Sequence, residues 1–358
     1  MEYENLVRFG LDDFYINEAK QYEGLFTARI TGQHRSLYRA VSERGFLNAS
    51  VSGRFIYNTQ KAEDFPAVGD WVMTDRDNDE AGNAVISHIL RRKSLFTRKA
   101  AGTSGTVQAV AANIDTVFIC MSLNADFNLS RAERYLALAW ESGAKPVIVL
   151  TKSDLCSDTE IKTALIESVS AGAETAVCSA AEPGGWLSLS EYIQEGKTIA
   201  FIGSSGAGKS TLINRLIGEE IIKTGEIRAK DEKGRHTTTS RELLLLPGGG
   251  AVIDTPGMRE LQLDTADISA VFDDIDMLAA ECRYSDCTHE SEPGCMVRNA
   301  VEAGSLSERR LASFRKLQRE TAYAEMNSRQ TENEKIKMMF GSKNAYKKAM
   351  RNIKKKNK

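Results

Sequence analysis

The segment Gly203–Ser210, GSSGAGKS, has the residue types and spacing of a phosphate-binding loop. The apolar run TIAFI precedes it and a run with helical periodicity follows, which is the strand–loop–helix context that this motif needs. Glycines let backbone amides turn towards phosphate oxygens, and the helix N-terminus adds partial positive charge. The bland alternative is a glycine-rich turn with an incidental lysine. The predicted phosphate contacts are Gly203, Ser204, Ser205, Gly206, Ala207, Gly208, Lys209, Ser210 and Thr211.

The sequence DTPG at Asp254–Gly257 could complete a magnesium and γ-phosphate site, because it follows the apolar run AVI. The Asp254 carboxylate would hold Mg²⁺ through water, and the Gly257 amide would meet the γ-phosphate. The segment GRHTTTS, residues 234–240, offers a threonine hydroxyl for the same ion, or else a strand edge. The predicted magnesium contacts are Ser210, Thr238 and Asp254.

His236 is our candidate for positioning an attacking water molecule. Many nucleotide hydrolases of this type place a glutamine beside the DxxG glycine, but Met258 stands there, and a thioether cannot orient water. The alternative is a structural loop histidine. The predicted catalytic residues are therefore His236, Lys209 and Thr238, with Thr237 and Thr239 as alternatives to Thr238.

A separate set of residues could recognise the base. TKSD follows the apolar run PVIVL, and the Asp154 carboxylate can accept hydrogen bonds from N1–H and the exocyclic amine of guanine, whereas adenine presents an acceptor there. The stem of Lys152 would cover the purine, and backbone amides further along would meet the guanine oxygen. Alone, TKSD also suits a loop that starts a helix. The predicted guanine contacts are Thr151, Lys152, Ser153, Asp154, Ser179 and Ala180.

Three cysteines and one histidine lie within a short stretch near the C-terminus. The spacing C-x4-C-x-H-x5-C supplies three thiolates and one imidazole, which is a closed set for tetrahedral zinc with no open position for catalysis. A disulfide would leave one thiol unpaired. The predicted zinc ligands are Cys282, Cys287, His289 and Cys295.

The elements that must position these groups alternate between strands and helices from residue 115 onwards. Apolar runs at residues 115–122, 146–150, 198–202 and 243–253 predict strands, the last a hairpin-like pair, and residues 130–143 predict an amphipathic helix ending at Gly143. Each motif follows such a strand, as ligand loops of α/β sheets do. The base-reading loops precede the phosphate loop, whereas an ordinary GTPase has them last. The order therefore predicts a circularly permuted α/β P-loop GTPase domain.

The preceding region has the character of a small β-domain. Five runs rich in β-branched and aromatic residues, separated by turn residues, predict five strands and favour an OB-fold barrel over another small β-fold. The basic residues that follow this module would attract phosphate. The predicted strands cover residues 25–31, 36–43, 46–55, 70–75 and 84–92, and the basic residues are Arg91, Arg92, Lys93, Arg98 and Lys99.

Composition sets further limits on a chain of 358 residues with net charge −2. Residues 331–358 carry ten Lys or Arg against two Glu, so the basic charge is concentrated at the C-terminal end. That tail could attract a phosphate backbone or be a solvated tail. No apolar run approaches the about 20 residues of a membrane-spanning helix. The scattered cysteines and the absence of a signal-peptide pattern indicate a cytoplasmic protein without a membrane partner.

Together these motifs resemble the RsgA (YjeQ/YloQ) family of circularly permuted GTPases. The resemblance rests on TKSD, SSGAGKST, GRHTTT, DTPG and the Cys/His spacing, and it covers nearly the whole chain from residue 23. It implies an N-terminal OB-fold, a permuted GTPase domain and a C-terminal, mainly helical zinc domain. It also implies GTP hydrolysis during late maturation of the small ribosomal subunit, stimulated by that subunit, with contacts to its 16S rRNA.

The chain is predicted to consist of five parts and to bind a nucleotide and two metal ions. We expect GTP or GDP, Mg²⁺ and one structural Zn²⁺ as cofactors, and a monomer as the working unit. A GTP-gated RNA-binding module with vestigial hydrolysis is the alternative. The predicted parts are an N-terminal extension at 1–22, partly helical, an OB-fold RNA-binding domain at 23–100, the permuted GTPase domain at 101–265, a zinc-binding domain at 266–340 and a basic tail at 341–358.

Overall fold

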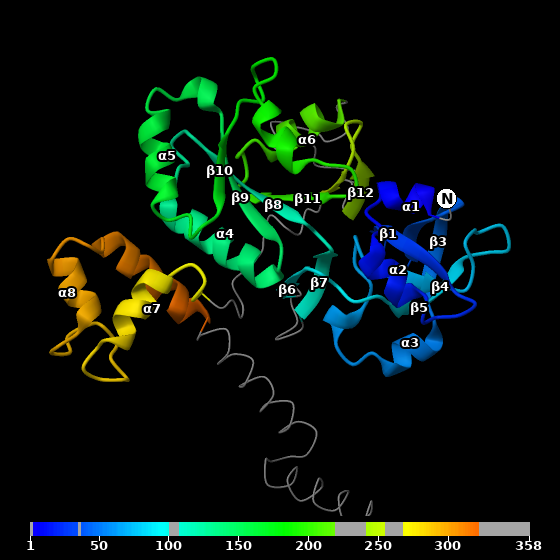
Figure 1. Cartoon of the computed structure of the whole chain (residues 1–358), viewed down its shortest axis with the longest axis horizontal. Coiled ribbons are helices and arrows are strands. Elements are labelled where there is room, and N and C mark those ends of the chain that lie inside the picture. Colours follow the sequence, from blue (N-terminus) through cyan, green and yellow to red (C-terminus); the bar gives the residue numbers. More distant parts are fainter. Residues whose placement is uncertain (1–2, 35–36, 100–106, 219–240, 255–267, 322–358) are drawn as a thin grey trace, which may run out of the picture.

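The structure is a computed structural model that describes residues 3–34, 37–99, 107–218, 241–254 and 268–321 (Figure 1). Figure 1 shows three parts: a small barrel, a larger sheet covered by helices, and a short helical part on the far side of that sheet. No described helix is both long enough and apolar enough to cross a membrane.

The N-terminal part is a closed barrel of five strands. Neighbouring strands follow the order β1-β2-β3-β5-β4, and β4 pairs again with β1, so no edge remains open. β3 and β5 run parallel, and the other pairs in the ring run antiparallel. The interior is apolar, with Ile30, Leu47, Val72 and Ile86 fully buried or nearly so. The strands are β1 (Phe26–His34), β2 (Leu37–Ser42), β3 (Gly45–Val51), β4 (Trp71–Thr74) and β5 (Ala84–Ile89).

The predicted barrel is confirmed, with one local correction. The strand expected at 46–55 ends at Val51, and the helix α3 (Gly53–Asn58) follows at once. The cause is Ser52, whose hydroxyl accepts a hydrogen bond from the Phe55 amide at 2.9 Å and so caps the new helix. A single-turn 3₁₀ helix, η1 (Ala62–Asp64), then leads towards β4.

The second part is an α/β sheet with strand order β10-β9-β8-β11-β13-β12, in which only β12 runs antiparallel to its neighbour. β8 and β11 are buried along their whole length, as expected for parallel strands covered on both faces. The predicted permuted α/β domain is thereby confirmed in its architecture. The strands are β8 (Thr116–Ser122), β9 (Lys145–Thr151), β10 (Glu174–Val177), β11 (Thr198–Gly203), β12 (Arg241–Leu245) and β13 (Ala251–Asp254).

Helices cover this sheet. The longest, α4, begins where the Asn128 side chain accepts a hydrogen bond from the Arg131 amide at 3.0 Å, and it ends at Gly143 with φ +83°. Its buried face contains Ala132, Leu136 and Ala139, which join the main apolar core. The helices of this part are α4 (Leu129–Ser142), α5 (Thr159–Glu167) and α6 (Lys209–Ile217), with the 3₁₀ helices η2 (Ser153–Leu155) and η3 (Leu187–Tyr192).

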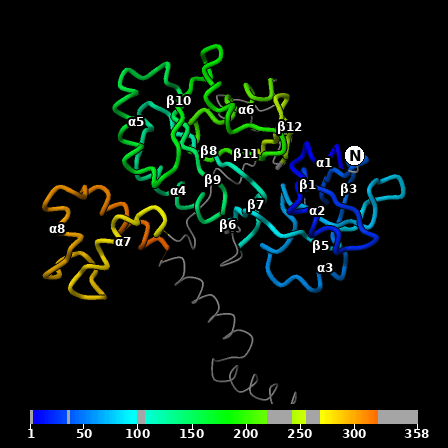
Figure 2. The backbone as a smooth tube through the Cα atoms, in the orientation of Figure 1, coloured from blue at the N-terminus to red at the C-terminus, as the bar shows by residue number. Residues whose placement is uncertain are grey.

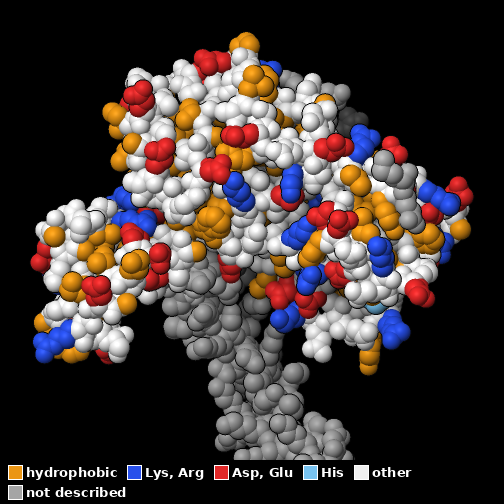
Figure 3. Space-filling view, viewed as in Figure 1, with side chains coloured by type: hydrophobic (Ala, Val, Ile, Leu, Met, Phe, Trp, Pro, Cys, Tyr) orange, Lys and Arg blue, Asp and Glu red, His pale blue; other side chains and the backbone are white. Residues whose placement is uncertain are grey.

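The barrel and the α/β sheet form one continuous sheet, because β1 also pairs with β12 through Gly32 and Glu242. Figure 2 shows the two parts side by side along this seam. A separate two-stranded sheet of β6 (Leu95–Lys99) and β7 (Val107–Ala112) connects them. The space-filling view shows acidic and basic side chains interspersed over this face (Figure 3).

The first described residues, from Tyr3 onwards, contribute to the core. The two helices α1 (Glu4–Arg8) and α2 (Asp13–Ala19) bury Leu6 and Tyr15 in the main apolar cluster. Lys93 pairs with Asp12, and the Arg91 guanidinium lies 4.6 Å from the centre of the Phe14 ring.

Arg92 binds Asp70 through two hydrogen bonds of 2.8 Å. Arg91, Arg92 and Lys93, expected from sequence to attract external phosphate, therefore have partners inside the protein.

The third part is helical. It comprises α7 (Asp273–Ala280), α8 (Met296–Glu302) and a further helix at 308–321, the last described residues. Its apolar centre includes Phe272 and Phe314, whose ring centres lie 5.4 Å apart. Val297 and Leu317 are buried in the same cluster.

Candidate functional site

The predicted nucleotide-binding motifs meet at one edge of the α/β sheet. Thr151 is the last residue of β9, Gly203 ends β11, Asp254 ends β13, and Ser179 follows β10 by two residues. Since these strands are parallel, their carboxyl ends lie on the same side, where α/β sheets bind ligands. The fold thus assembles in space motifs that are far apart in the chain.

The phosphate loop has the backbone form that its glycines predict. Gly203, Gly206 and Gly208 all have positive φ. A Cβ at position 203 would lie 2.3 Å from the Cys120 carbonyl oxygen, so only glycine fits between β11 and β8. α6 begins at Lys209, whose buried ammonium donates to the carbonyl oxygens of Gly203, at 2.7 Å, and Ser204. The lysine charge is therefore held at the loop that the phosphates would occupy.

The base-reading loops are held together by side-chain hydrogen bonds. Ser179 Oγ donates to Asp154 Oδ1 at 2.6 Å, which joins the loop after β9 to the loop after β10. Lys152 adopts the left-handed conformation, φ +60°, which turns the chain sharply between the strand and Asp154. Ser153 opens the 3₁₀ turn η2, and Ala180 follows Ser179 directly.

Thr151 connects the base-reading side of the site to the phosphate side. Its buried hydroxyl donates to the Ala207 carbonyl oxygen at 2.8 Å, between loops 56 residues apart. Many GTPases use an asparagine amide at this position, and the hydroxyl of Thr151 provides such a connection here. The two halves of the candidate site are therefore fixed relative to each other.

We expect Thr151→Val to lower the free energy of unfolding of the nucleotide-free protein by about 1–3 kcal/mol, because the Ala207 carbonyl loses its buried donor. Urea unfolding measures this. Thr198→Val is the matched control, since the Thr198 hydroxyl is equally buried and has no hydrogen-bond partner among the described residues. That control should not lower stability, because it removes a buried hydroxyl that has no partner to lose in the described part of the chain. Equal losses in both variants would show that the Thr151 hydroxyl makes no special connection.

Two further residues, Arg215 and Asp126, support the nucleotide-binding loops. Neither belongs to a sequence motif, so the sequence did not predict their roles. Arg215 of α6 donates from Nε to the Ala180 carbonyl at 3.1 Å, and its guanidinium lies 5.6 Å from the centre of the Trp186 ring. Asp126, in the loop after β8, accepts a hydrogen bond from the Ser204 hydroxyl. The sequence offered one indication of a role for Asp126, which is its position shortly after a strand that ends at the ligand-binding edge of the sheet.

The structure leaves part of the predicted site outside the described residues. Ser205, Ser210 and Thr211 lie in the phosphate loop and the first turn of α6, and Asp254 is the last described residue of β13. The remaining predicted contacts lie outside the described ranges: His236, Thr237, Thr238, Thr239 and Gly257.

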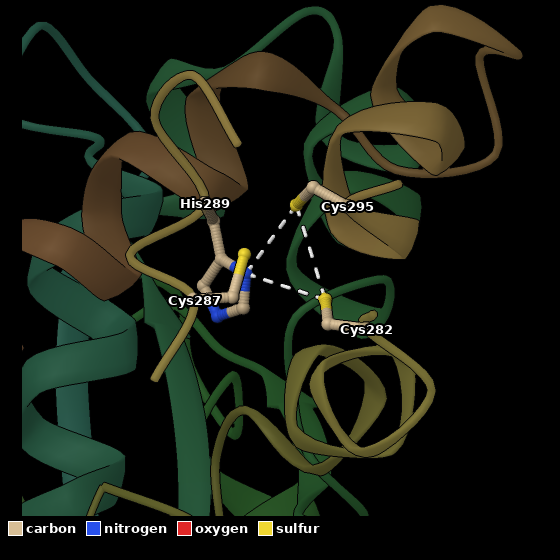
Figure 4. A group of neighbouring side chains, drawn as sticks. All are labelled: Cys282, Cys287, His289 and Cys295. Atoms are coloured by element: carbon tan, nitrogen blue, oxygen red, sulfur yellow. Dashed lines mark hydrogen bonds between the residues drawn. The ribbon is translucent and has the colours of Figure 1, made fainter. Parts of the chain in front are cut away.

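The Cys/His cluster converges on one point. Figure 4 shows Cys282, Cys287, His289 and Cys295 turned towards one another, and their ligand atoms all lie within 4.8 Å. Cys282 Sγ and Cys295 Sγ are 3.9 Å apart, and His289 Nδ1 is 3.7 and 3.5 Å from them. A tetrahedron with Zn–S bonds of ~2.3 Å and a Zn–N bond of ~2.0 Å has edges of ~3.8 Å between sulfurs and ~3.5 Å from sulfur to nitrogen. The distances among Cys282, His289 and Cys295 therefore match those of a zinc site, and Cys287 lies within 4.8 Å of these three ligand atoms.

The surroundings prepare these groups for a cation. Burial and the neighbouring Arg315 guanidinium lower the pKa of His289, which favours the neutral imidazole that metal binding requires. Arg315 also donates to the His289 carbonyl oxygen. Cys295 is the N-cap of α8, and its Sγ accepts from the Arg298 amide at 3.4 Å, which fixes the position of the sulfur.

Comparison with known proteins gives a consistent result. A family model described as RsgA GTPase matches residues 89–264, and an ABC transporter model matches residues 187–344, a range that includes the phosphate loop. The small ribosomal subunit biogenesis GTPase RsgA 2 of Lactiplantibacillus plantarum is 50% identical over 343 residues, covering 96% of this chain and 97% of that protein. The corresponding GTPase RsgA of Opitutus terrae is 46% identical and covers 89% of this chain and 90% of its own length.

Two solved structures have a similar fold. YjeQ from Thermotoga maritima superimposes with a TM-score of 0.61 at 28% identity, covering 83% of this chain and 99% of that one. YloQ, described as a circularly permuted GTPase, gives 0.58 at 22% identity, covering 84% and 96%. The second likeness concerns the fold alone.

Proposed function

Because the chain belongs to the RsgA family of GTPases, we propose that it hydrolyses GTP during biogenesis of the small ribosomal subunit. The observation that carries this proposal is the joint placement of Asp154 and Lys209 at one sheet edge, with Thr151 connecting their loops. Asp154 can recognise guanine while Lys209 holds the phosphates of the same nucleotide. The names of close relatives supply the ribosomal role.

The residues of the nucleotide site have distinct proposed roles in GTP hydrolysis. The backbone amides of the phosphate loop and Lys209 hold the β- and γ-phosphates and stabilise the charge of the transition state. Ser210, Asp254 and Thr238 are the residues that would hold Mg²⁺, which would neutralise part of the phosphate charge. His236 positions the attacking water, and the Gly257 amide contacts the γ-phosphate. For His236, Thr238 and Gly257 the support comes from the sequence.

We propose that the cluster of Cys282, Cys287, His289 and Cys295 binds one structural zinc ion, on the strength of its tetrahedral dimensions. We also propose the five-part domain division that the sequence predicts. In it, the N-terminal barrel contacts 16S rRNA, as OB-folds commonly contact nucleic acid. None of the six cysteines forms a disulfide, which fits the proposed action in the cytoplasm, and we propose a monomer as the working unit.

The test is phosphate release from GTP and from ATP by the full-length protein, with and without purified small subunits. We expect GTP to be hydrolysed in preference to ATP, and faster when subunits are present. Lys209→Ala should reduce the rate by about 100-fold or more, because a charge that stabilises the transition state is lost. Lys145→Gln, which removes an exposed pair with Glu174 and a contact with the Tyr192 ring, should not. Tight GTP binding without stimulated turnover would favour a GTP-gated binding module instead.

A further inference from the structure

α4 and the loop that leads into it contact two different parts of the molecule. In the loop that leads into it, Asp126 accepts from the Ser204 hydroxyl of the phosphate loop and pairs with Arg131 in the first turn of α4 at 2.6 Å. The loop is ordered by its own contacts, because the Asp126 amide donates to Asn124 Oδ1 at 2.9 Å. The Leu123 amide donates to the Thr151 carbonyl at 2.9 Å. The start of α4 is thus tied to the phosphate loop.

About one turn into α4, the helix contacts the C-terminal part. Glu133 is completely buried, and its two carboxylate oxygens accept from Arg309 at 3.1 Å each. Arg310 donates to the same carboxylate at 3.0 Å and makes two hydrogen bonds of 2.7 Å to Asp274. Two guanidinium groups and two carboxylates therefore form a compact ion cluster between α4 and residues 268–321.

This cluster is the polar centre of a larger contact. The Arg310 guanidinium also lies 4.8 Å from the centre of the Phe272 ring, and it donates to the Val271 carbonyl at 2.8 Å. A second pair, Arg134 with Glu320, lies beside it on the same helix. Removing one partner from a buried ion cluster is strongly destabilising, since the other charge is left unpaired. The docking of the C-terminal part on α4 therefore depends on Glu133.

We propose that α4 and the loop before it couple the phosphate loop to the Cys/His domain, with Asp126 and Glu133 as the two contact points. Asp126 lies three residues before the first residue of α4 and Glu133 is the fifth residue of that helix, so a shift of the loop also displaces Glu133. This inference rests on the proposed function, and it names the route by which the bound nucleotide acts on the C-terminal part.

The electrostatics of the loop give the coupling a direction. Lys209 donates to the Ser204 carbonyl while the Ser204 hydroxyl donates to Asp126. Phosphates draw the lysine charge towards themselves and bring negative charge towards the Asp126 carboxylate. Nucleotide binding therefore weakens the contact between Ser204 and Asp126, and through α4 it loosens the docking of residues 268–321.

Amide hydrogen exchange of the full-length protein tests this. On binding a non-hydrolysable GTP analogue, we expect exchange in the helix at 308–321 to become about fivefold faster, the lower range of coupling between sites. Coupling is reciprocal, so Arg309→Gln, which weakens the docking, should raise the affinity for the analogue by about the same factor. Arg309 is partly exposed, so this variant is milder than a change of the buried Glu133.

Asp126→Asn isolates the route, because the asparagine oxygen still accepts from Ser204 while the charge is gone. It should bind the analogue but lose most of the exchange difference at 308–321. Lys145→Gln, outside this path, should retain the full difference. An unchanged response in Asp126→Asn would overturn the route through α4, and no response in the wild-type protein would overturn the coupling itself. Absence of any guanine-nucleotide binding would instead contradict the proposed function.

Discussion

Removing the metal from Cys282, Cys287, His289 and Cys295 is expected to unfold residues 282–302, while the barrel and the α/β sheet keep their structure. The flanking helices α7 and α8 have only eight and seven residues, lengths at which an isolated helix is not stable in water. The loop between them carries the ligands and has little apolar burial of its own. Structural zinc supplies about 10–16 kcal/mol in small domains, so its loss exceeds what the remaining contacts can offset.

The measurement is amide exchange before and after treatment with a strong chelator, with the released metal quantified. Protection at 282–302 should vanish, and added Zn²⁺ should restore it. Cys295→Ser should reproduce the loss, because a hydroxyl is a poor zinc ligand. Cys156→Ser is the matched control, since that partly buried thiol lies far along the chain from the cluster. Persistent protection in the metal-free protein would mean that the Cys/His group is not a structural metal site.

The sequence was sufficient for the architecture because most of the signal is local. β8 and β11 are uninterrupted apolar runs, and such runs identify buried parallel strands without knowledge of their partners. Gly143 and Asn128 likewise mark the ends of α4 by their own chemistry. The pairing of β1 with β12 was not predictable, because Gly32 and Glu242 carry no feature that identifies them as partners.

Arg29 explains why the sequence predicts only an extension at residues 1–22, because it is Arg29 that binds the Phe9 carbonyl of this segment. An arginine within a strand suggests an exposed face, yet this side chain is buried and donates to the carbonyls of Phe9, Gly69 and Asn113. Burial lowers the pKa of Arg29 to about 10, and three carbonyl acceptors from different parts of the chain hold the guanidinium. These three acceptors surround Arg29 only after the segments have come together in the fold, so no short sequence pattern predicts that its side chain is buried.

The candidate site contains contiguous motifs, which the sequence reveals, and contacts between distant residues, which it does not. The phosphate loop and the Cys/His cluster are contiguous, so residue type and spacing reveal them. Asp126 acts on Ser204 across 78 residues, and Glu133 meets Arg309 across 176. These carboxylates resemble ordinary solvent-exposed residues in the sequence. Only the fold shows that one lies in the loop before α4 and the other on α4, each at a contact with a distant segment.

Asp154→Asn is expected to reverse the base preference of the nucleotide site. The carboxylate would accept two hydrogen bonds from guanine, each to a charged group and worth about 1.5–3 kcal/mol, so their loss predicts a fall in GDP affinity of about 10²–10⁴. An asparagine can instead donate to the 2-oxo group of xanthine while accepting from its N1–H. The loop itself should be retained, because the asparagine oxygen can still accept from Ser179 Oγ.

Calorimetric titration of the wild-type and Asp154→Asn proteins with GDP and XDP measures this reversal. We expect tight GDP and weak XDP binding for the wild-type protein, and the opposite order for the variant. Asp158→Asn is a matched control four residues away, because its carboxylate pairs with Lys162 on the surface and should not affect base choice. If Asp154→Asn bound GDP as the wild type does, Asp154 could not be the base reader. The proposal that one nucleotide spans from Asp154 to Lys209 would then fail, whatever the phosphate loop binds.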